Sequence, residues 1–225
     1  MIFSMKKKYI IISLILVAIV LACVIVPSVK VGVKPKYEYT IVIDAGHGGR
    51  DGGSVGDISI EKDLNLKYAE ALKKLLIKAN IKVVMTRSGD DGLYDEDADN
   101  KKLSDMRARR DIIRDAQPDL VVSVHMNSYP LSNCVGAKTF YKIGSEASFK
   151  VAKSIQNSLH YYVDNASSTV SEGDYYILNC TNYTSVLIEC GFISNPNEEQ
   201  LLNDDTYCEK FMYSVYCGIM LYLGF

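Results

Sequence analysis

The sequence of 225 residues predicts an α/β fold: a single domain with a six-stranded, largely parallel, twisted sheet flanked by helices. Two observations predict this fold. Short apolar runs rich in β-branched residues alternate along the chain with longer segments whose apolar residues recur at helical spacing. No internal repeat interrupts this alternation, and strands that alternate with helices form parallel sheets with helices on both faces. The length suffices for one such domain and an N-terminal appendage.

The appendage is an apolar segment that follows Lys6, Lys7 and Lys8. Residues 9–29 carry no charge, and as a helix they would cover about 31 Å, close to the hydrocarbon thickness of a bilayer. A cleaved signal peptide is the alternative, but its apolar core is shorter and ends in small residues. We therefore expect one N-terminal transmembrane or signal-anchor helix within residues 1–29, a tether over 30–37 and the folded domain over 38–225, exported from the cytoplasm. Cleavage would instead release a secreted domain.

Charge and cysteine content exclude some classes of protein. Residues 30–225 hold 22 of the 25 Lys and Arg residues and all 27 Asp and Glu residues, a net charge of about −5. Such a domain has no basic field for nucleic acid, so no nucleic-acid partner is expected. Five cysteines lie in this part of the chain, and their odd number does not predict a full disulfide framework. We interpret them as small buried hydrophobic residues.

The first half of the domain alternates strand and helix. A β-branched run ends in a glycine-rich turn, which is typical of a buried strand that enters a tight turn. The next segment carries apolar residues on one helical stripe that faces a sheet, from Leu64 and Tyr68 to Leu72 and Leu76. The predicted elements are a strand over 37–44, a helix over 61–79, a strand over 81–86, an acidic loop over 88–102 and a helix over 103–116.

The second half continues the alternation. The run DLVVSVH is a third buried strand, and Asn195-Pro196 is the N-cap and first residue of a short helix. The predicted elements are strands over 119–125 and 136–141, a helix over 145–163, strands over 175–178 and 185–189, and a final helix over 205–223.

Three chemically active side chains fall at the carboxyl ends of predicted strands. His47 follows the first strand, His125 ends the third and Glu189 ends the last. Ligands of open α/β sheets bind beyond the carboxyl ends of the strands, so we expect these residues to share a site. The third histidine, His160, lies within a predicted helix and is interpreted as an ordinary packing or surface residue.

Glu61 adds a carboxylate to the two histidines. It begins a predicted helix, where a carboxylate can simply interact favourably with the helix dipole. The same position also lets it point across the sheet edge toward His47. Two imidazoles and one carboxylate with an open position are the ligand set of a catalytic zinc, so one Zn²⁺ is expected at His47, Glu61 and His125.

Glu189 stands at the end of the apolar run VLIE. A buried charge there is costly unless it is paired or functional, and a salt bridge to an arginine such as Arg87 is the structural alternative. In the functional interpretation, Glu189 accepts a proton from the attacking water and later returns it to a leaving amine. An amide is the natural substrate of such a site.

Several motifs together resemble one family. IDAGHGGRDGG at 43–53, Ser123-x-His125-x-Asn127 and LIECGFISNP at 187–196 are similar to the zinc-dependent N-acetylmuramoyl-L-alanine amidases, called amidase type 3. The resemblance covers residues 38–222. It implies that His47, Glu61 and His125 bind zinc and that Glu189 is the catalytic glutamate. The implied reaction is hydrolysis of the amide between N-acetylmuramic acid and L-alanine of the peptidoglycan stem peptide.

The compact build resembles a subgroup of this family. Asn127 and Gly136 are only nine positions apart, too close for the inserted segment that shields the zinc in other members. An N-terminal anchor with a bare catalytic domain is similar to the germination-specific amidases of spore formers, which act on the spore cortex on the way to muramic-δ-lactam. This likeness implies a place in the cell envelope or forespore intermembrane space, and a separate activating or positioning protein partner.

Two alternatives of different classes stay open. Another zinc peptidase of the wall, such as a carboxypeptidase, would share the ligands and cut within the stem peptide. A non-catalytic peptidoglycan-binding module would keep the fold and a structural metal. The intact Glu189 argues against the binding module, because a binder needs no base beside the metal.

Overall fold

The computed structural model describes residues 38–225, which form one compact unit. The predicted anchor over 1–29 and tether over 30–37 lie outside the described residues. Among the helices of residues 38–225, none combines the length and the apolar character that a membrane span requires.

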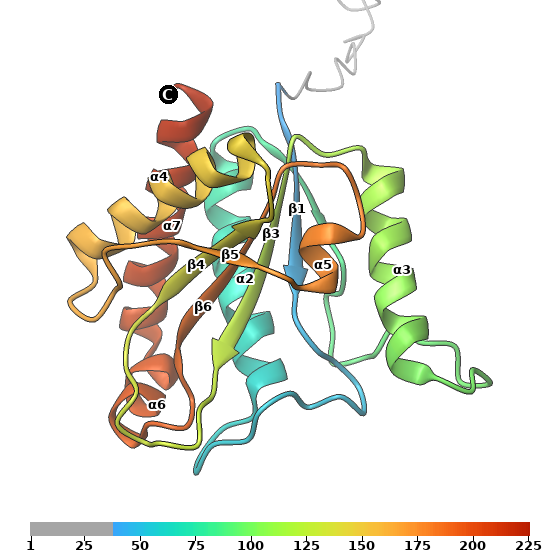
Figure 1. The fold of residues 1–225 in the computed structure, drawn as a ribbon, viewed down its shortest axis with the longest axis horizontal. Coiled ribbons are helices and arrows are strands. Elements are labelled where there is room, and N and C mark those ends of the chain that lie inside the picture. The colour runs from blue at the N-terminus through green and yellow to red at the C-terminus, as the bar shows by residue number, and fades with distance from the viewer. Residues whose placement is uncertain (1–37) are drawn as a thin grey trace, which may run out of the picture. The chain divides into compact units, whose positions relative to one another are not determined.

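The centre of the domain is one six-stranded sheet in the order β2-β1-β3-β6-β4-β5 (Figure 1). The first four of these strands pair in parallel, whereas β4 pairs antiparallel with β6 and parallel with β5. The predicted six-stranded, largely parallel sheet is therefore confirmed. The strands are β1 (Thr40–Ala45), β2 (Lys82–Met85), β3 (Leu120–Asn127), β4 (Lys138–Lys142), β5 (Ser171–Gly173) and β6 (Ser185–Phe192).

Helices cover both faces of the sheet (Figure 1). Helices α2, α4 and α7 pack on one face around the larger core cluster, and α3 and α5 contribute to a smaller cluster on the other face. The short α6 precedes α7 at the end of the chain. The helices are α2 (Glu61–Lys78), α3 (Lys101–Ala116), α4 (Glu146–Tyr162), α5 (Tyr176–Asn179), α6 (Pro196–Asn203) and α7 (Asp205–Leu223).

The central strands are buried on both faces. In β1, Ile41 and Ile43 belong to the larger cluster and Val42 to the smaller one, because successive side chains of a strand point to opposite faces. This explains why the strand is a continuous apolar run instead of an alternating one. All five cysteines of the described residues are free thiols. Cys190 and Cys208 are buried in the larger cluster, as predicted, but the other three are only half-buried, so the interpretation as buried hydrophobic residues holds for two of the five.

The predicted strand over 175–178 is wrong. That segment is α5, and the fifth strand lies earlier, at Ser171–Gly173. Ile177 and Leu178 are adjacent in sequence, yet both are buried in the same cluster. A strand would send the two side chains to opposite faces, so one helical turn is what lets both reach the smaller core. The aromatic and β-branched composition of the segment concealed this.

Polar caps set two helix starts. Asn100 accepts a hydrogen bond from the Leu103 backbone N–H, so α3 begins at Lys101, earlier than predicted. At α6, Asn195 caps the backbone N–H groups of Asn197 and Glu198, and Pro196 is the first helical residue, as predicted. Residues 128–137, between β3 and β4, contain no helix that could cover the neighbouring sheet edge.

Candidate metal centre and catalytic site

The turn after β1 places His47 at the carboxyl edge of the sheet. His47 has a left-handed backbone, with φ 60°, and is flanked by glycines. A Cβ atom on Gly46 would lie 2.2 Å from Cε1 of His125, so only glycine allows the turn to pass against the His125 ring. The glycine-rich turn therefore passes directly against the His125 ring near the end of β3.

Two buried arginines hold this turn from its two sides. Arg87 donates to the carbonyl groups of Ala45, Gly46 and Lys62 at 2.7–3.0 Å. Arg109 donates to the carbonyl groups of Ala45 and His47 at 2.8 and 2.6 Å. Both guanidinium groups thus donate to backbone carbonyl groups of the turn, and Arg87 also ties the turn to α2 through Lys62, which helps to hold the left-handed His47.

Arg109 also forms a buried ion pair. Its Nη1 lies 2.7 Å from Oδ1 of Asp44, and both side chains are 2% exposed. Asp44 further accepts hydrogen bonds from the hydroxyl groups of Thr86 and Ser123. Burial alone would raise the pKa of Asp44, but Arg109 and these donors outweigh it and lower that pKa to about 2. The pair thus stays ionised beneath the turn at physiological pH.

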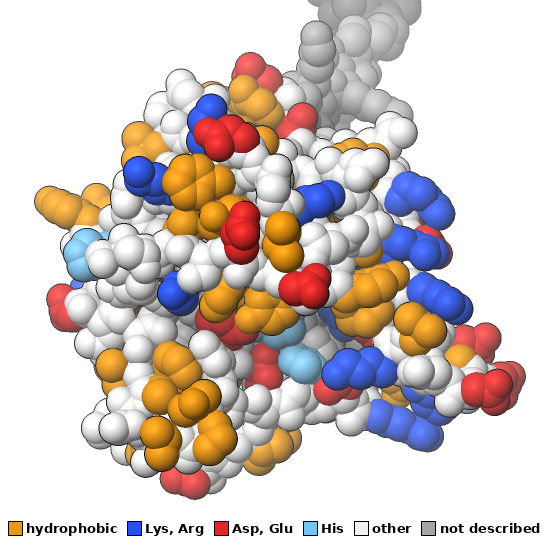
Figure 2. Space-filling view, in the orientation of Figure 1, with side chains coloured by type: hydrophobic (Ala, Val, Ile, Leu, Met, Phe, Trp, Pro, Cys, Tyr) orange, Lys and Arg blue, Asp and Glu red, His pale blue; other side chains and the backbone are white. Residues whose placement is uncertain are grey.

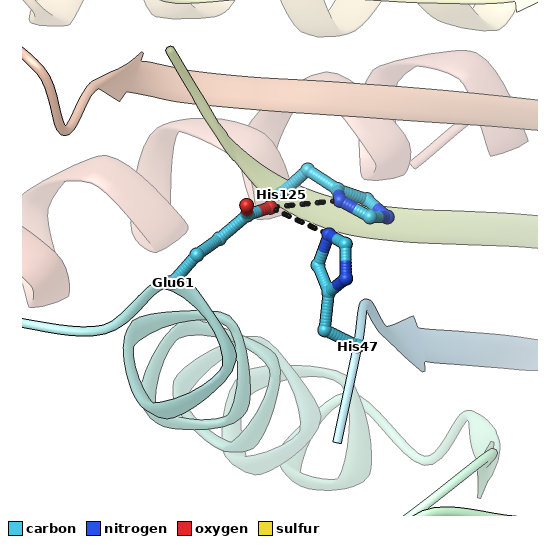
Figure 3. Close-up of side chains that lie close together, drawn as sticks. All are labelled: His47, Glu61 and His125. Carbon is cyan, nitrogen blue, oxygen red and sulfur yellow. Dashed lines mark hydrogen bonds and ion pairs between the residues drawn. The ribbon is translucent and has the colours of Figure 1, made fainter. Parts of the chain in front are cut away.

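His47, Glu61 and His125 converge at the sheet edge (Figure 3). Oε1 of Glu61 lies 3.2 Å from Nε2 of His47 and 3.0 Å from Nδ1 of His125. The two imidazole rings meet edge to face with centroids 5.0 Å apart. One nitrogen of each ring and one carboxylate oxygen lie within 4.8 Å of one another, so the three residues can ligate a single metal ion.

Glu61 is 3% exposed and surrounded by donors. Its oxygens accept from the backbone N–H groups of Ser54 and Met126 and from the side-chain amide of Asn65. Burial raises the pKa of Glu61, but the hydrogen bonds from His125 and His47 outweigh burial and hold that pKa below its ordinary value. The carboxylate is therefore ionised, which is the form that binds a metal.

Glu189 stands beside this cluster on β6. Its Cα is in register with that of His125, so the two side chains leave neighbouring strands at the same level. Glu189 is 8% exposed, and within residues 38–225 its Oε2 has no hydrogen-bond partner. Burial raises its pKa to about 7, against the opposing charges of the two histidines. The alternative of an ion pair with Arg87 is excluded, because that guanidinium donates to carbonyl groups instead.

The cluster opens into a cavity of about 160 Å³. Histidine side chains reach the surface in a depression, with hydrophobic side chains above them and Lys or Arg side chains to one side (Figure 2). Nothing in residues 128–137 covers this opening with a helix. The cavity is lined by Asp44, Gly46, His47, Asp51, Lys102, Asp105, Met106, Arg109, His125, Tyr175, Tyr176, Ile177 and Leu187.

The structure brings together His47, Glu61, His125 and Glu189, as the sequence predicted. His160 lies apart on α4, where Nδ1 is 3.0 Å from the Ala166 carbonyl oxygen, in keeping with its interpretation as an ordinary residue. The sequence did not predict that Arg87 and Arg109 support the turn that carries His47. Arg109 also donates from Nε to Oδ2 of Asp105 on its own helix, at 2.6 Å.

The spacing of the residues around Arg109 in the sequence does indicate that its side chain is buried. Met106 and Ile113 lie three residues before and four residues after it, so the three share one face of α3. Ile113 is fully buried in the smaller cluster. An arginine in the middle of a buried helical stripe needs an acidic partner, and Asp44 at the end of β1 is that partner.

Comparison with known proteins identifies the class. The family model of the N-acetylmuramoyl-L-alanine amidases matches residues 41–220, and the chain belongs to this family of hydrolases. The germination-specific N-acetylmuramoyl-L-alanine amidase of Bacillus subtilis is 36% identical over 187 residues, which cover 81% of this chain and 78% of that protein.

Solved structures agree with this assignment. The CwlD amidase from Clostridioides difficile, in complex with the GerS lipoprotein, has a TM-score of 0.79 and 38% identity and covers 82% of this chain and 98% of its own. An N-acetylmuramoyl-L-alanine amidase from Clostridium difficile 630 has a TM-score of 0.74 and 30% identity, with 82% of this chain and 96% of that chain covered. The predicted family and the predicted single α/β domain are thus confirmed.

Proposed function

We propose that the chain uses zinc to hydrolyse the amide bond between N-acetylmuramic acid and L-alanine in peptidoglycan, with His47, Glu61 and His125 as ligands and Glu189 as proton carrier. One observation carries the proposal: three ligand side chains converge at the sheet edge beside a buried carboxylate that has no hydrogen-bond partner on Oε2 among residues 38–225. A structural metal would need no such carboxylate, so this arrangement favours an enzyme over a binding module.

The donor set fits zinc. Bonds of about 2.0–2.1 Å at a tetrahedral angle would separate neighbouring ligand atoms by roughly 3.3 Å. The separations of Glu61 Oε1 from the two imidazole nitrogens, 3.2 and 3.0 Å, are close to that value. Two imidazoles with one carboxylate leave a fourth position open, which is typical of catalytic zinc.

Zinc bound here would supply a Lewis acid that polarises the amide carbonyl and makes water more acidic. Glu189 would take a proton from the attacking water and then deliver it to the nitrogen of the departing L-alanine. A pKa of about 7 suits both steps, because the same group must accept and then release a proton near neutral pH. Glu61 cannot replace it, since its carboxylate is held by two imidazoles.

The biological setting of the proposal is spore-cortex or wall remodelling, including germination. The names of the Bacillus subtilis and Clostridioides difficile relatives support that setting, and the GerS complex supports a protein partner for this chain. We also propose that residues 9–29 anchor the chain in the membrane and that residues 38–225 form the exported catalytic domain in the cell envelope. The uncharged run behind three lysines supports this topology.

Product analysis tests the activity. The full chain, supplied with zinc, is incubated with peptidoglycan beside the Glu189→Gln variant, and metal content is measured for both. We expect stem peptides with a free L-alanine amino terminus from the parent only, with near-stoichiometric zinc in both proteins. Release of a C-terminal amino acid from intact stems would instead establish a carboxypeptidase. Equal peptidoglycan binding without any cleavage by the zinc-loaded parent would establish a binding module.

A further inference from the structure

The cavity beside His47, Glu61 and His125 has one wall formed by α3 and α5 and the residue before α5. Tyr175, Tyr176 and Ile177 form an aromatic and apolar wall, and Met106 continues it from α3. Lys102, from the first turn of α3, also lines this cavity and is exposed to solvent. A ligand that is bound at the three proposed metal ligands can therefore also contact the apolar wall and the Lys102 ammonium group, because all of them line the same cavity.

Lys102 has no partner of its own among residues 38–225: it makes no ion pair and no side-chain hydrogen bond there. The three carboxylates that share the cavity lining are already bound, and Asp44 among them pairs with Arg109. Asp105 accepts from Nε of Arg109 at 2.6 Å and from the backbone N–H of Leu93 at 2.7 Å. Oδ1 of Asp51 lies 2.9 Å from Nδ1 of His47 and accepts from the backbone N–H of Gly53. The ammonium group is thus free to bind an anion that enters the cavity.

We propose that Lys102 is a specificity-determining residue that binds the free α-carboxylate of the second stem-peptide residue, a D-glutamate. This inference rests on the proposed amidase function. With the scissile amide at the metal cluster, the methyl group of L-alanine contacts the wall formed by Tyr175 and Tyr176. The next residue is joined to the rest of the stem through its γ-carboxyl group, so its α-carboxylate is free to face the ammonium group. When that carboxylate is amidated, the ion pair is lost.

Paired ligands and variants test the proposal through binding. The full chain carrying Glu189→Gln and loaded with zinc is titrated with N-acetylmuramoyl-L-Ala-D-Glu and with the same compound ending in D-isoglutamine. We expect the carboxylate ligand to bind about two- to fivefold more tightly, as for other exposed ion pairs. Adding Lys102→Ala should abolish this preference, and Lys102→Arg should retain it.

Arg107 is the matched control. It lies on the same helix, is exposed, makes no ion pair among the described residues and does not line the cavity. Arg107→Ala should leave the preference for the carboxylate unchanged, which separates a local contact from a general effect of positive charge. An equal preference in the Lys102→Ala protein, no preference in the parent or no binding of either ligand would each overturn the proposal.

Activity measurements separate this inference from the proposed function. In the enzyme with Glu189 intact, Lys102→Ala should raise KM for the carboxylate substrate about two- to fivefold and leave kcat unchanged, with no effect on the amidated substrate. If binding shows the expected preference but the amide is never cut, the amidase function fails and the anion site stands. If both substrates are cut equally well by parent and variant, the amidase function stands and the anion site fails.

Discussion

Two buried glutamates of one site differ in their surroundings. Glu61 is 3% exposed and Glu189 is 8% exposed, so both side chains are buried. Glu61 lies at the start of α2 among two imidazoles, two backbone N–H groups and the Asn65 amide. Glu189 ends an apolar run on β6, and its Oε2 has no partner among residues 38–225. The pKa of Glu61 is held below its ordinary value, whereas the pKa of Glu189 is raised to about 7.

One fold can thus give two buried glutamates opposite pKa shifts. Burial acts on both carboxylates in the same direction, so the donors around each one decide the outcome. A carboxylate fixed by donors stays ionised and can hold a metal, while one without donors can exchange a proton near neutral pH. We therefore expect substitution of Glu189 to impair proton transfer and substitution of Glu61 to impair zinc binding.

The largest effect is expected for Glu189→Gln. The variant keeps the shape of the side chain and loses the proton acceptor, so kcat should fall by roughly 10²–10⁴-fold. Zinc content should stay at the level of the parent, because Glu189 is outside the ligand cluster. Hydrolysis of a soluble muramyl peptide and metal analysis on the same preparations measure both. Loss of zinc together with activity would remove the distinction between the two glutamates.

Glu61→Gln should instead impair zinc binding. Removing the ligand charge should weaken zinc binding by more than about 100-fold, which exceeds the loss typical of residues behind the ligands. Activity should therefore fall at limiting zinc and recover in part when zinc is added in excess. Competition with a chelating dye measures the affinity. Unchanged zinc affinity in this variant would contradict the assignment of Glu61 as a ligand.

In the metal-free protein, the two glutamates should make the free energy of unfolding depend on pH in opposite ways. The folded pKa of Glu189 is raised above its ordinary 4.5 to about 7, so its contribution to stability is present below pH 4.5 and is lost as pH rises through 7. Glu189→Gln removes that loss and should be more stable than the parent at pH 8, by about 3 kcal/mol. The folded pKa of Glu61 is lowered, so its contribution is present above pH 4.5 and lost on acidification. Glu61→Gln should be less stable than the parent at pH 8.

Denaturant unfolding in a metal chelator measures this pair of variants. The gain of Glu189→Gln over the parent should shrink between pH 8 and pH 5, where Glu189 of the parent is itself protonated. Shifts of the same sign in both variants at pH 8 would show that burial alone governs the two carboxylates.

The main parts of this site were predictable because their signals are local. The apolar runs of β1, β3 and β6 each end in a residue of the cluster or beside it, and parallel strands bring such ends to one edge. The roles proposed for His47, His125 and Glu189 follow from that placement. The type of fold followed from the same runs.

Other features depend on contacts that a local pattern does not contain. Arg109 can be buried because it forms an ion pair with Asp44, which is 65 residues away in the sequence. The segment Tyr175–Leu178 has the composition of a strand, but the smaller core needs Ile177 and Leu178 on one side, which only a helical turn provides. Both features depend on partners that lie far away in the sequence and that only the fold brings close.

The smallest effect is expected for Asn65, whose side chain links the turn at Gly46 to Glu61. It is fully buried on α2, and its side-chain amide donates to the Gly46 carbonyl at 3.1 Å and to Oε1 of Glu61 at 3.3 Å. Asn65→Ala should weaken zinc binding about tenfold, the lower end for residues that orient metal ligands, and leave kcat at saturating zinc close to that of the parent. Ser214→Ala is the matched control, because it truncates a fully buried polar side chain on α7 that bonds only within its helix. If both variants bind zinc as the parent does, the ionisation of Glu61 does not depend on the Asn65 amide, and the imidazoles and backbone donors alone account for the difference between the two glutamates.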